Sequence, residues 1–444
     1  MRSIHLQHFR CYSDLRLELK PGINLFVGDN ASGKTSLLRA CQYMLSSFFA
    51  GFSDEYTKWL SFGDDDFQQE FQRGKQLDEQ PISISFDPTD LIERLSPEYL
   101  EEQGPLGEQV LEKRSAKNRR ALTGGFKAYR SYAQWLQSHY YDREAARQSY
   151  PLPLFAYYSV EDIHSNRKLS LQPFSKTTSK FSLGYLECLE GDGFLRYWVH
   201  RLLVLAESDP EHSELGFVRR QMLQILGAEG CDLFYDMLIR PIKREVVFVT
   251  PDGREIPTAF LSEGYKRIIS MSLDLVMRSY LLDYPIYGDE TCRHITGTVI
   301  IDEIDMHLHP RLQAEILPVL HRCFPALQFI VSTHAPMVMS GVQSDGTNIV
   351  YRLRCSSEAE YCLEEATTYG LDISTLVERL WELSPRSHEV SSQLTELFHA
   401  IDAGDYQRAR ELLQRLRQAF PGGELKELTR ADTLLRLMQR PDRL

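Results

Sequence analysis

The chain has 444 residues, of which 43% are hydrophobic and 25% charged, a composition ordinary for a folded globular protein. Its formal net charge of -12 argues against a protein that coats nucleic acid indiscriminately, because such binding depends on neutralising phosphates. Its 8 cysteines form no C-x-x-C pair, and the chain contains neither a secretory leader nor a long uncharged apolar run, so we expect a cytoplasmic protein without a membrane span.

The first 50 residues are predicted to form three strands and a helix. Residues 3–9 and 15–19 have the pattern of paired strands, and residues 23–27 have that of a buried strand. Residues 34–49 carry apolar side chains at helical spacing. Between the buried strand and this helix, GDNASGKT at positions 28–35 fits G-x-x-x-x-G-K-[ST] at every fixed position.

That segment predicts a loop that binds the phosphates of a nucleoside triphosphate. Its backbone N–H groups and the helix N-terminus attract phosphate oxygens. Lys34 supplies a positive charge to the β- and γ-phosphates, and the Thr35 hydroxyl coordinates Mg²⁺. The residues expected to contact the nucleotide are Asn30, Ala31, Ser32, Gly33, Lys34, Thr35 and Ser36.

The middle of the chain has a weaker hydrophobic periodicity than the first 50 residues. Residues 51–150 are polar and interrupted by Gly and Pro, and stretches such as 62–72 and 97–109 are predicted to form loops or short exposed helices, whereas residues 152–158 are predicted to form a core strand. The segment 112–130, EKRSAKNRRALTGGFKAYR, is strongly basic, with Lys113, Arg114, Lys117, Arg119 and Arg120 as its candidate contacts. Two interpretations of it stay open: a contact for nucleic acid or an acidic partner, or a solvated charged loop.

Further along, strands alternate with helices. The pattern predicts a helix at about 264–280, a strand at 298–301, a helix at about 311–323 and a strand at 328–332. This alternation predicts an α/β fold whose largely parallel sheet is covered on both faces.

We expect three regions. Residues 1–50 and 245–355 form the core, residues 51–244 an inserted, partly helical region, and residues 356–444 a C-terminal helical region. Within the last region, residues 390–403 and 406–420 predict an antiparallel helical hairpin.

Two adjacent carboxylates end the predicted strand at 298–301. Asp302 and Glu303 therefore lie at the carboxyl edge of the sheet, where α/β proteins bind ligands. Asp302 can hold Mg²⁺ through its water shell, since this ion takes few protein ligands. Glu303 can polarise the attacking water, and general-base assistance of this kind contributes roughly 10²–10⁴ in rate.

Residues 261–267, LSEGYKR, resemble the LSxGxx[KR] motif of ABC and SMC-type ATPases. Ser262 is also a predicted helix N-cap, which is compatible with that role. The resemblance implies an ABC-type ATPase head with a mixed sheet flanked by helices. It also implies that Ser262, Glu263 and Gly264 contact ATP bound to a second copy, so that ATP joins two copies.

Other parts of this family resemblance follow in order. His334, after the strand at 328–332, resembles the histidine that contacts the γ-phosphate, and Asp305 matches the loop along the dimer interface. Arg10 matches a basic residue that SMC- and RecF-like ATPases place near the nucleotide. For His307 and His309 we expect packing or capping, because a third metal ligand is lacking.

The sequences DEIDMHLHP at 302–310 and QFIVSTHAPMVM at 328–339 resemble those of a narrower group of ATPases. This group comprises ATPases of the overcoming-lysogenisation type and of Septu-like and retron-associated antiphage systems. The chain after residue 342 carries no spaced Glu…Asp-x-Asp set of a fused Toprim nuclease.

The resemblance implies a sensor or regulator that forms a dimer or larger oligomer and controls a separate effector nuclease or toxin. The alternative is a RecF-like DNA-repair ATPase that clamps DNA when ATP drives dimerisation. A transporter subunit is disfavoured, because more than two hundred residues separate the phosphate loop from Ser262.

Overall fold

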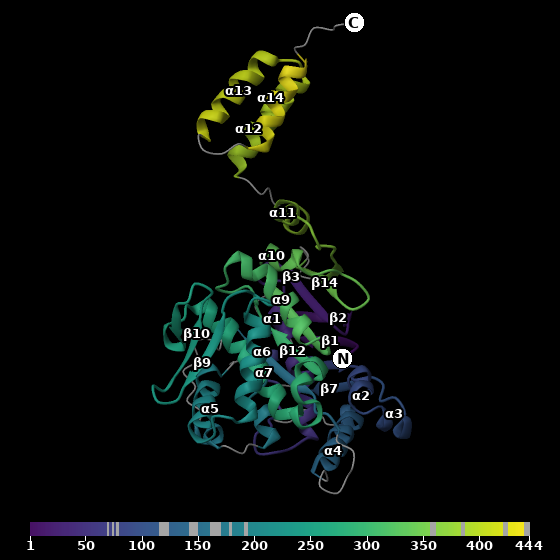
Figure 1. The fold of residues 1–444 in the computed structure, drawn as a ribbon. Coiled ribbons are helices and arrows are strands. Elements are labelled where there is room, and N and C mark those ends of the chain that lie inside the picture. The colour runs from purple at the N-terminus through teal and green to yellow at the C-terminus, as the bar shows by residue number, and fades with distance from the viewer. Residues whose placement is uncertain are drawn as a thin grey trace. The chain divides into compact units, whose positions relative to one another are not determined.

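The computed structural model describes residues 1–68, 71–72, 75–76, 80–114, 124–141, 150–159, 170–176, 180–190, 194–355, 361–382, 387–420 and 425–438. The chain divides into two compact units, Met1–Leu371 and Asp372–Leu444. The first holds the sheets and most helices, and the second is helical (Figure 1).

A six-stranded sheet forms the centre of the first unit, in the order β15-β14-β3-β13-β12-β8. The strands are β3 (Ile23–Gly28), β8 (Leu154–Tyr158), β12 (Gly297–Ile301), β13 (Leu327–Thr333), β14 (Ile349–Cys355) and β15 (Tyr361–Glu365). All neighbours pair in parallel except β14 with β15, so the sheet is mixed. Every residue of β3, β12 and β13 is buried. The predicted α/β class and these central strands are confirmed.

A second sheet is antiparallel, with the order β2-β1-β6-β7. Its strands are β1 (Ser3–Phe9), β2 (Tyr12–Glu18), β6 (Ile82–Phe86) and β7 (Gln109–Lys113). No strand was predicted for β6 or β7, because both are short and lie in a polar part of the chain. In β6 the sequence ISISF buries Ile82, Ile84 and Phe86, and the strand pairs with β1.

Helix α1 (Lys34–Ser46) lies between the two sheets, since it contacts β3, β12 and β13 as well as β1 and β6. Helix α7 (Glu263–Tyr287) extends beyond its predicted end and packs against β8, α5 (Leu195–Ser208) and α6 (Ser213–Leu226). Helix α9 (Pro310–Cys323) closely matches the prediction. The phosphate loop therefore leads into a helix that is buried from both sides.

The first unit contains a third sheet, a short hairpin and several further helices. A three-stranded sheet has the order β11-β10-β9. Its strands are β9 (Asp236–Arg240), β10 (Glu245–Val249) and β11 (Glu255–Pro257), and a short hairpin pairs β4 (Phe71–Gln72) with β5 (Lys75–Gln76). The other helices are α2 (Thr89–Leu95), α3 (Pro97–Gln103), α4 (Lys127–Tyr141), α8 (Thr291–His294) and α10 (Pro336–Ser340).

The second unit contains α11 (Ile373–Trp381), α12 (His388–Asp402), α13 (Tyr406–Ala419) and α14 (Lys426–Met438). Helices α12 and α13 are the predicted hairpin, and α14 contacts both to enclose a core that includes Leu397, Leu412 and Leu428. Among the described residues, no helix combines the length and the apolarity needed to cross a bilayer.

The structural units differ from the three predicted regions. Strand β8, from the region expected to be an insertion, is part of the central sheet. Strand β15 lies beyond residue 355, yet it pairs with β14 in the same sheet, and the boundary between the units falls after Leu371. The first difference arises because β8 pairs with β12, which lies far along the chain, and the second because β15 forms a hairpin with β14.

Candidate functional site

The phosphate loop joins the end of β3 to the start of α1. Ala31 and Gly33 both have left-handed backbone conformations, with φ of 64° and 95°. A Cβ at Gly33 would also lie 2.5 Å from the hydroxyl oxygen of Tyr12. This hydroxyl donates a hydrogen bond to the Gly33 carbonyl oxygen at 2.9 Å, so Tyr12 supports the point where the loop enters the helix.

The ammonium group of Lys34 lies inside this loop. Its Nζ donates to the carbonyl oxygens of Gly28 at 3.0 Å and Asp29 at 2.8 Å, and to the Ser32 hydroxyl at 3.2 Å. Burial lowers the pKa of Lys34, and the nearby carboxylates, Asp302 first among them, oppose that shift. The loop thus holds a cation among oxygen atoms, next to the carboxylates that end β12.

The Ser332 hydroxyl on β13 fixes the two carboxylate residues. Asp302 is almost fully buried, with 3% exposure, and its carboxylate accepts a hydrogen bond from Ser332. The Glu303 N–H donates to the same Ser332 oxygen at 2.8 Å. With φ of 48°, Glu303 turns the chain away from the strand and lines a cavity that Asp302 does not line.

Asp305 positions His334 next to Glu303. The Asp305 carboxylate accepts hydrogen bonds from the Thr333 hydroxyl and from the His334 N–H, the latter at 3.2 Å. The His334 Nε2 atom lies 3.9 Å from Glu303 Oε1. The structure therefore brings a histidine and a carboxylate together at one end of the phosphate loop.

A cavity of about 470 Å³ collects most of the predicted nucleotide contacts. All seven predicted residues of the phosphate loop line it, together with Glu303 and His334. Cys11 and Tyr361 also line it, and sequence reasoning missed both. Cys11 follows Arg10 in the turn between β1 and β2, and Tyr361 begins β15, so neither belongs to a fixed position of the motifs.

The residues present fit a magnesium–nucleotide complex. The Thr35 hydroxyl and the Asp302 carboxylate are oxygen donors, the kind Mg²⁺ prefers, and this ion usually takes only one or two carboxylates plus phosphate oxygens. Among the described residues, no group of three or more His, Cys, Asp or Glu side chains could hold a metal by itself. His309 accepts a hydrogen bond from the Arg311 N–H and caps α9, one of the two roles predicted for it.

Arg10 lies outside this cavity. Its guanidinium Nε is 2.8 Å from Asp66, whose buried carboxylate also accepts a hydrogen bond from the Tyr43 hydroxyl. The assignment of Arg10 to the nucleotide stays a prediction.

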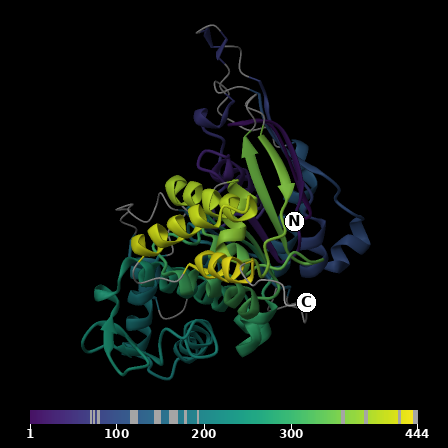
Figure 2. The same ribbon diagram turned by 90° about the horizontal axis from the view of Figure 1, so that it is seen from above.

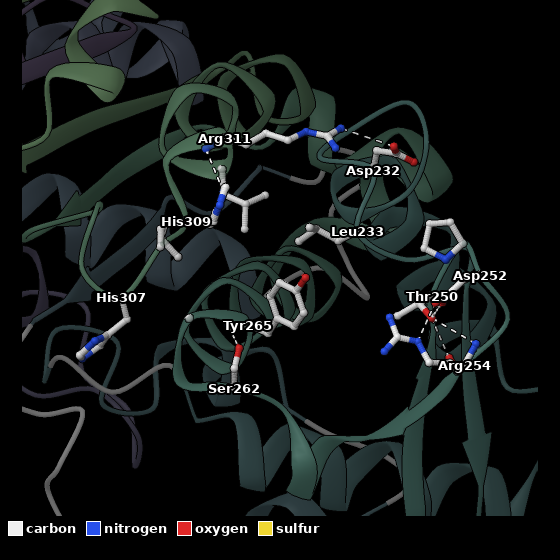
Figure 3. Close-up of a pocket in the computed structure, with 14 residues that line it drawn as sticks. Asp232, Leu233, Thr250, Asp252, Arg254, Ser262, Tyr265, His307, His309 and Arg311 are labelled. Carbon is white, nitrogen blue, oxygen red and sulfur yellow. Dashed lines mark hydrogen bonds and ion pairs between the residues drawn. The ribbon is translucent and has the colours of Figure 1, made fainter. Parts of the chain in front are cut away.

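Ser262 and Gly264 line a second cavity, of about 670 Å³, rather than the cavity of the phosphate loop (Figure 3). The Ser262 hydroxyl accepts a hydrogen bond from the Tyr265 N–H at 3.4 Å and caps α7, as predicted. Glu263 pairs with Lys266 at 2.9 Å on the protein surface. Figure 3 places Ser262 and Tyr265 between two groups of side chains, namely His307 and His309 on one side and Thr250, Asp252 and Arg254 on the other.

The start of α7 packs tightly against the loop that carries Glu303. A Cβ at Gly264 would lie 2.3 Å from the backbone oxygen of His307. Arg267 donates to the carbonyl oxygens of Asp302 at 2.7 Å and Glu303 at 2.8 Å. Sequence reasoning missed this role of Arg267, although its place at the basic position of LSxGxx[KR] could have indicated it.

The basic segment 112–130 is only partly described. Lys113 is buried, and its ammonium group donates to the Phe62 carbonyl oxygen at 2.8 Å and lies over the Phe67 ring. The burial of Lys113 fits neither of the two interpretations left open for this segment, because its ammonium group is not available to nucleic acid and is not solvated. Arg114 is exposed. Lys117, Arg119 and Arg120 lie outside the described residues.

Residues 23–340, well over half of the chain, match the family described as "AAA domain, putative AbiEii toxin, Type IV TA system". The chain belongs to this family. The family is one of AAA domains, and the predicted resemblance to ATPases of antiphage systems is confirmed by the chain's relatives.

One relative is "Retron Vc95 probable ATPase" of Vibrio cholerae serotype O1 biovar El Tor, which is 39% identical over 24% of this chain and 20% of that protein. Another is "Septu protein PtuA" of Bacillus thuringiensis, 25% identical over 53% of this chain and 60% of that protein. The matches thus span less than two thirds of either relative. A solved SMC head bound to the C-winged helix domain of ScpA aligns with 82% of this AAA-family chain and 98% of that chain, at 14% identity and a TM-score of 0.46.

The contact at Gly264 predicts a stability effect. We expect Gly264→Ala to lower the free energy of unfolding by about 1–3 kcal/mol, because the methyl group would overlap the His307 backbone oxygen. Chemical denaturation of the full chain measures this. Gly346→Ala is the matched control, since a Cβ there meets no atom within 4 Å. Equal stability of the two variants would contradict the prediction.

Proposed function

We propose that the protein is the ATP-hydrolysing sensor or regulator subunit of an antiphage defence system in the cytoplasm. It acts as a head-to-head dimer or larger oligomer and controls a separate effector nuclease or toxin. The observation that carries the proposal is that the predicted nucleotide residues of one chain line two separate cavities, which we call half-sites. Lys34, Glu303 and His334 line the first, and Ser262 lines the second.

The first half-site has the groups that ATP hydrolysis needs. Lys34 and the N-terminus of α1 neutralise the phosphates, while Thr35 and Asp302 hold Mg²⁺. Glu303 orients and polarises the attacking water, and His334, 3.9 Å from it, contacts the γ-phosphate. Phosphoryl transfer depends mainly on such positioning and charge stabilisation. These residues therefore include each type of group that ATP hydrolysis requires.

The second half-site supports an arrangement of two copies. The capped N-terminus of α7, with the Ser262 hydroxyl beside it, is suited to an anion. In a symmetric dimer, the same surface of each copy meets its counterpart. Ser262, Glu263 and Gly264 of one copy then face ATP on the phosphate loop of the other, and two equivalent sites form. ATP thereby contributes to the interface.

The part played in defence rests on the relatives. The matched segments belong to proteins named as a retron ATPase and a Septu protein. These names support a part in antiphage defence, and the separate effector belongs to the proposal.

Glu303→Gln tests the hydrolytic role. We expect phosphate release to fall by about 10²–10⁴, because the amide cannot accept a proton from the attacking water. The ATP-bound assembly should persist, as measured by light scattering with ATP and Mg²⁺. Glu389→Gln, on the exposed start of α12, is the control and should hydrolyse ATP like the wild type. Normal turnover in Glu303→Gln would rule out this role for Glu303.

Mixing two inactive variants tests whether the sites are shared. Lys34→Ala removes the phosphate contact, and Ser262→Arg blocks the partner's nucleotide, so each variant alone should be inactive. In a random mixture, half of the dimers pair one variant with the other and regain one of their two sites. We therefore expect about a quarter of wild-type phosphate release, as the symmetry of the dimer dictates. Zero activity in a mixture shown by mass to contain mixed dimers would contradict the shared site.

The alternative is a RecF-like ATPase that clamps DNA, and a binding measurement separates the two functions. The net charge of -12 and the buried Lys113 lead us to expect that ATP leaves the affinity for duplex DNA unchanged. Fluorescence anisotropy at several salt concentrations measures this affinity. Binding that requires ATP and falls steeply with salt would instead support the DNA clamp.

A further inference from the structure

Tyr361 lines the phosphate-loop cavity, yet it belongs to none of the recognised motifs. We propose that its ring forms the wall that binds the base of the nucleotide and stacks on the adenine of ATP. The inference rests on the proposed function, because it assigns a further part of the same nucleotide site.

The strand order places Tyr361 opposite the groups that face the γ-phosphate. Strand β3, which leads into the phosphate loop, lies between β13 and β14. His334 and Glu303 follow β13 and β12 on one side. On the other side, Leu353 of β14 pairs with Gly28, and Tyr361 of β15 pairs with Cys355. Figure 2 shows the β14–β15 hairpin as two green antiparallel arrows beside the purple N-terminal strands.

This arrangement gives the bound nucleotide a direction. Lys34 takes the β- and γ-phosphates, and Glu303 and His334 mark the γ-phosphate end of the cavity. The ribose and base must then extend away from that end. Cys11, which contacts Ser36, and Tyr361 line the remaining wall.

Neighbouring contacts hold the Tyr361 ring in place. It meets the ring of Tyr12 edge-on, with 5.5 Å between centroids and 70° between planes. Tyr12 is buried, and its hydroxyl donates to the Gly33 carbonyl oxygen. Tyr361 itself is only half-buried, so part of its ring is accessible from the cavity.

Stacking suits both the residue and the space. Aromatic side chains bind nucleobases through their π-faces and need no specific hydrogen bonds. The cavity volume of about 470 Å³ lies in the range of small-molecule sites, roughly 300–1,000 Å³. A purely structural role for Tyr361, as a support for Tyr12 and the loop, would instead affect the phosphate contacts.

Binding of two ligands distinguishes these roles. We would measure dissociation constants for Mg²⁺–ATP and for Mg²⁺–tripolyphosphate, which lacks a base, by calorimetry on the full chain. Tyr361→Ala should weaken ATP binding by about 5- to 100-fold, the usual cost of losing a base–aromatic stack. Its affinity for tripolyphosphate should equal that of the wild type. Tyr361→Phe keeps the ring and should keep ATP affinity.

Tyr369→Ala is the matched control, because Tyr369 is 54% exposed and does not line the cavity. Unchanged ATP affinity in Tyr361→Ala would overturn the inference while leaving the proposed function intact. An equal loss of affinity for both ligands would also overturn it and would assign Tyr361 a supporting role. Wild-type protein that binds neither ligand would contradict the proposed function itself.

Discussion

A single hydroxyl group, that of Ser332, holds the site together where β12 and β13 end. It donates to the Asp302 carboxylate and accepts from the Glu303 N–H, so it fixes two adjacent acids with different surroundings. A buried carboxylate is costly unless it is hydrogen-bonded, and Ser332 supplies that bond to Asp302. The register that pairs Ile301 with Val331 sets Ser332 opposite the acids. Parallel strand pairing therefore decides where the acids lie.

The same loop connects the two half-sites within one copy. Arg267 binds the carbonyl oxygens of Asp302 and Glu303, and Gly264 allows α7 to approach His307. The residues proposed to face the partner's ATP are thus attached to the loop that carries the proposed water-polarising Glu303. In a dimer, contact made by α7 with the partner's nucleotide would bear directly on the chain's own hydrolytic loop. This is a physical route for coupling between two sites, because it consists of contiguous packed contacts.

Motifs and buried strands could be predicted because they depend on local sequence. An apolar run such as β12 indicates a buried strand, and the phosphate loop needs its residues in one fixed order. Tyr361 could not be found in this way, since pairing of β15 with β14 brings it to the cavity. Lys113 was misjudged for a similar reason: within a basic run its ammonium group still reaches the Phe62 carbonyl oxygen. The contacts of Tyr361 with Tyr12 and of Lys113 with Phe62 leave no trace in spacing or composition.

Across the sheet, the strands follow the order of the parts of the nucleotide that they are proposed to contact. From one edge, β15 presents the base wall, β3 the phosphate loop, and β13 and β12 the groups at the γ-phosphate. At the other edge, the Tyr158 hydroxyl of β8 donates to Asp274 of α7 at 2.8 Å, and the same carboxylate binds Arg278 at 2.7 Å. The Tyr158 hydrogen bond ties α7, and with it Ser262, to the sheet, and the buried Asp274–Arg278 pair within α7 holds the accepting carboxylate in place. One sheet thereby positions both the proposed nucleotide site and the surface proposed to meet a second copy.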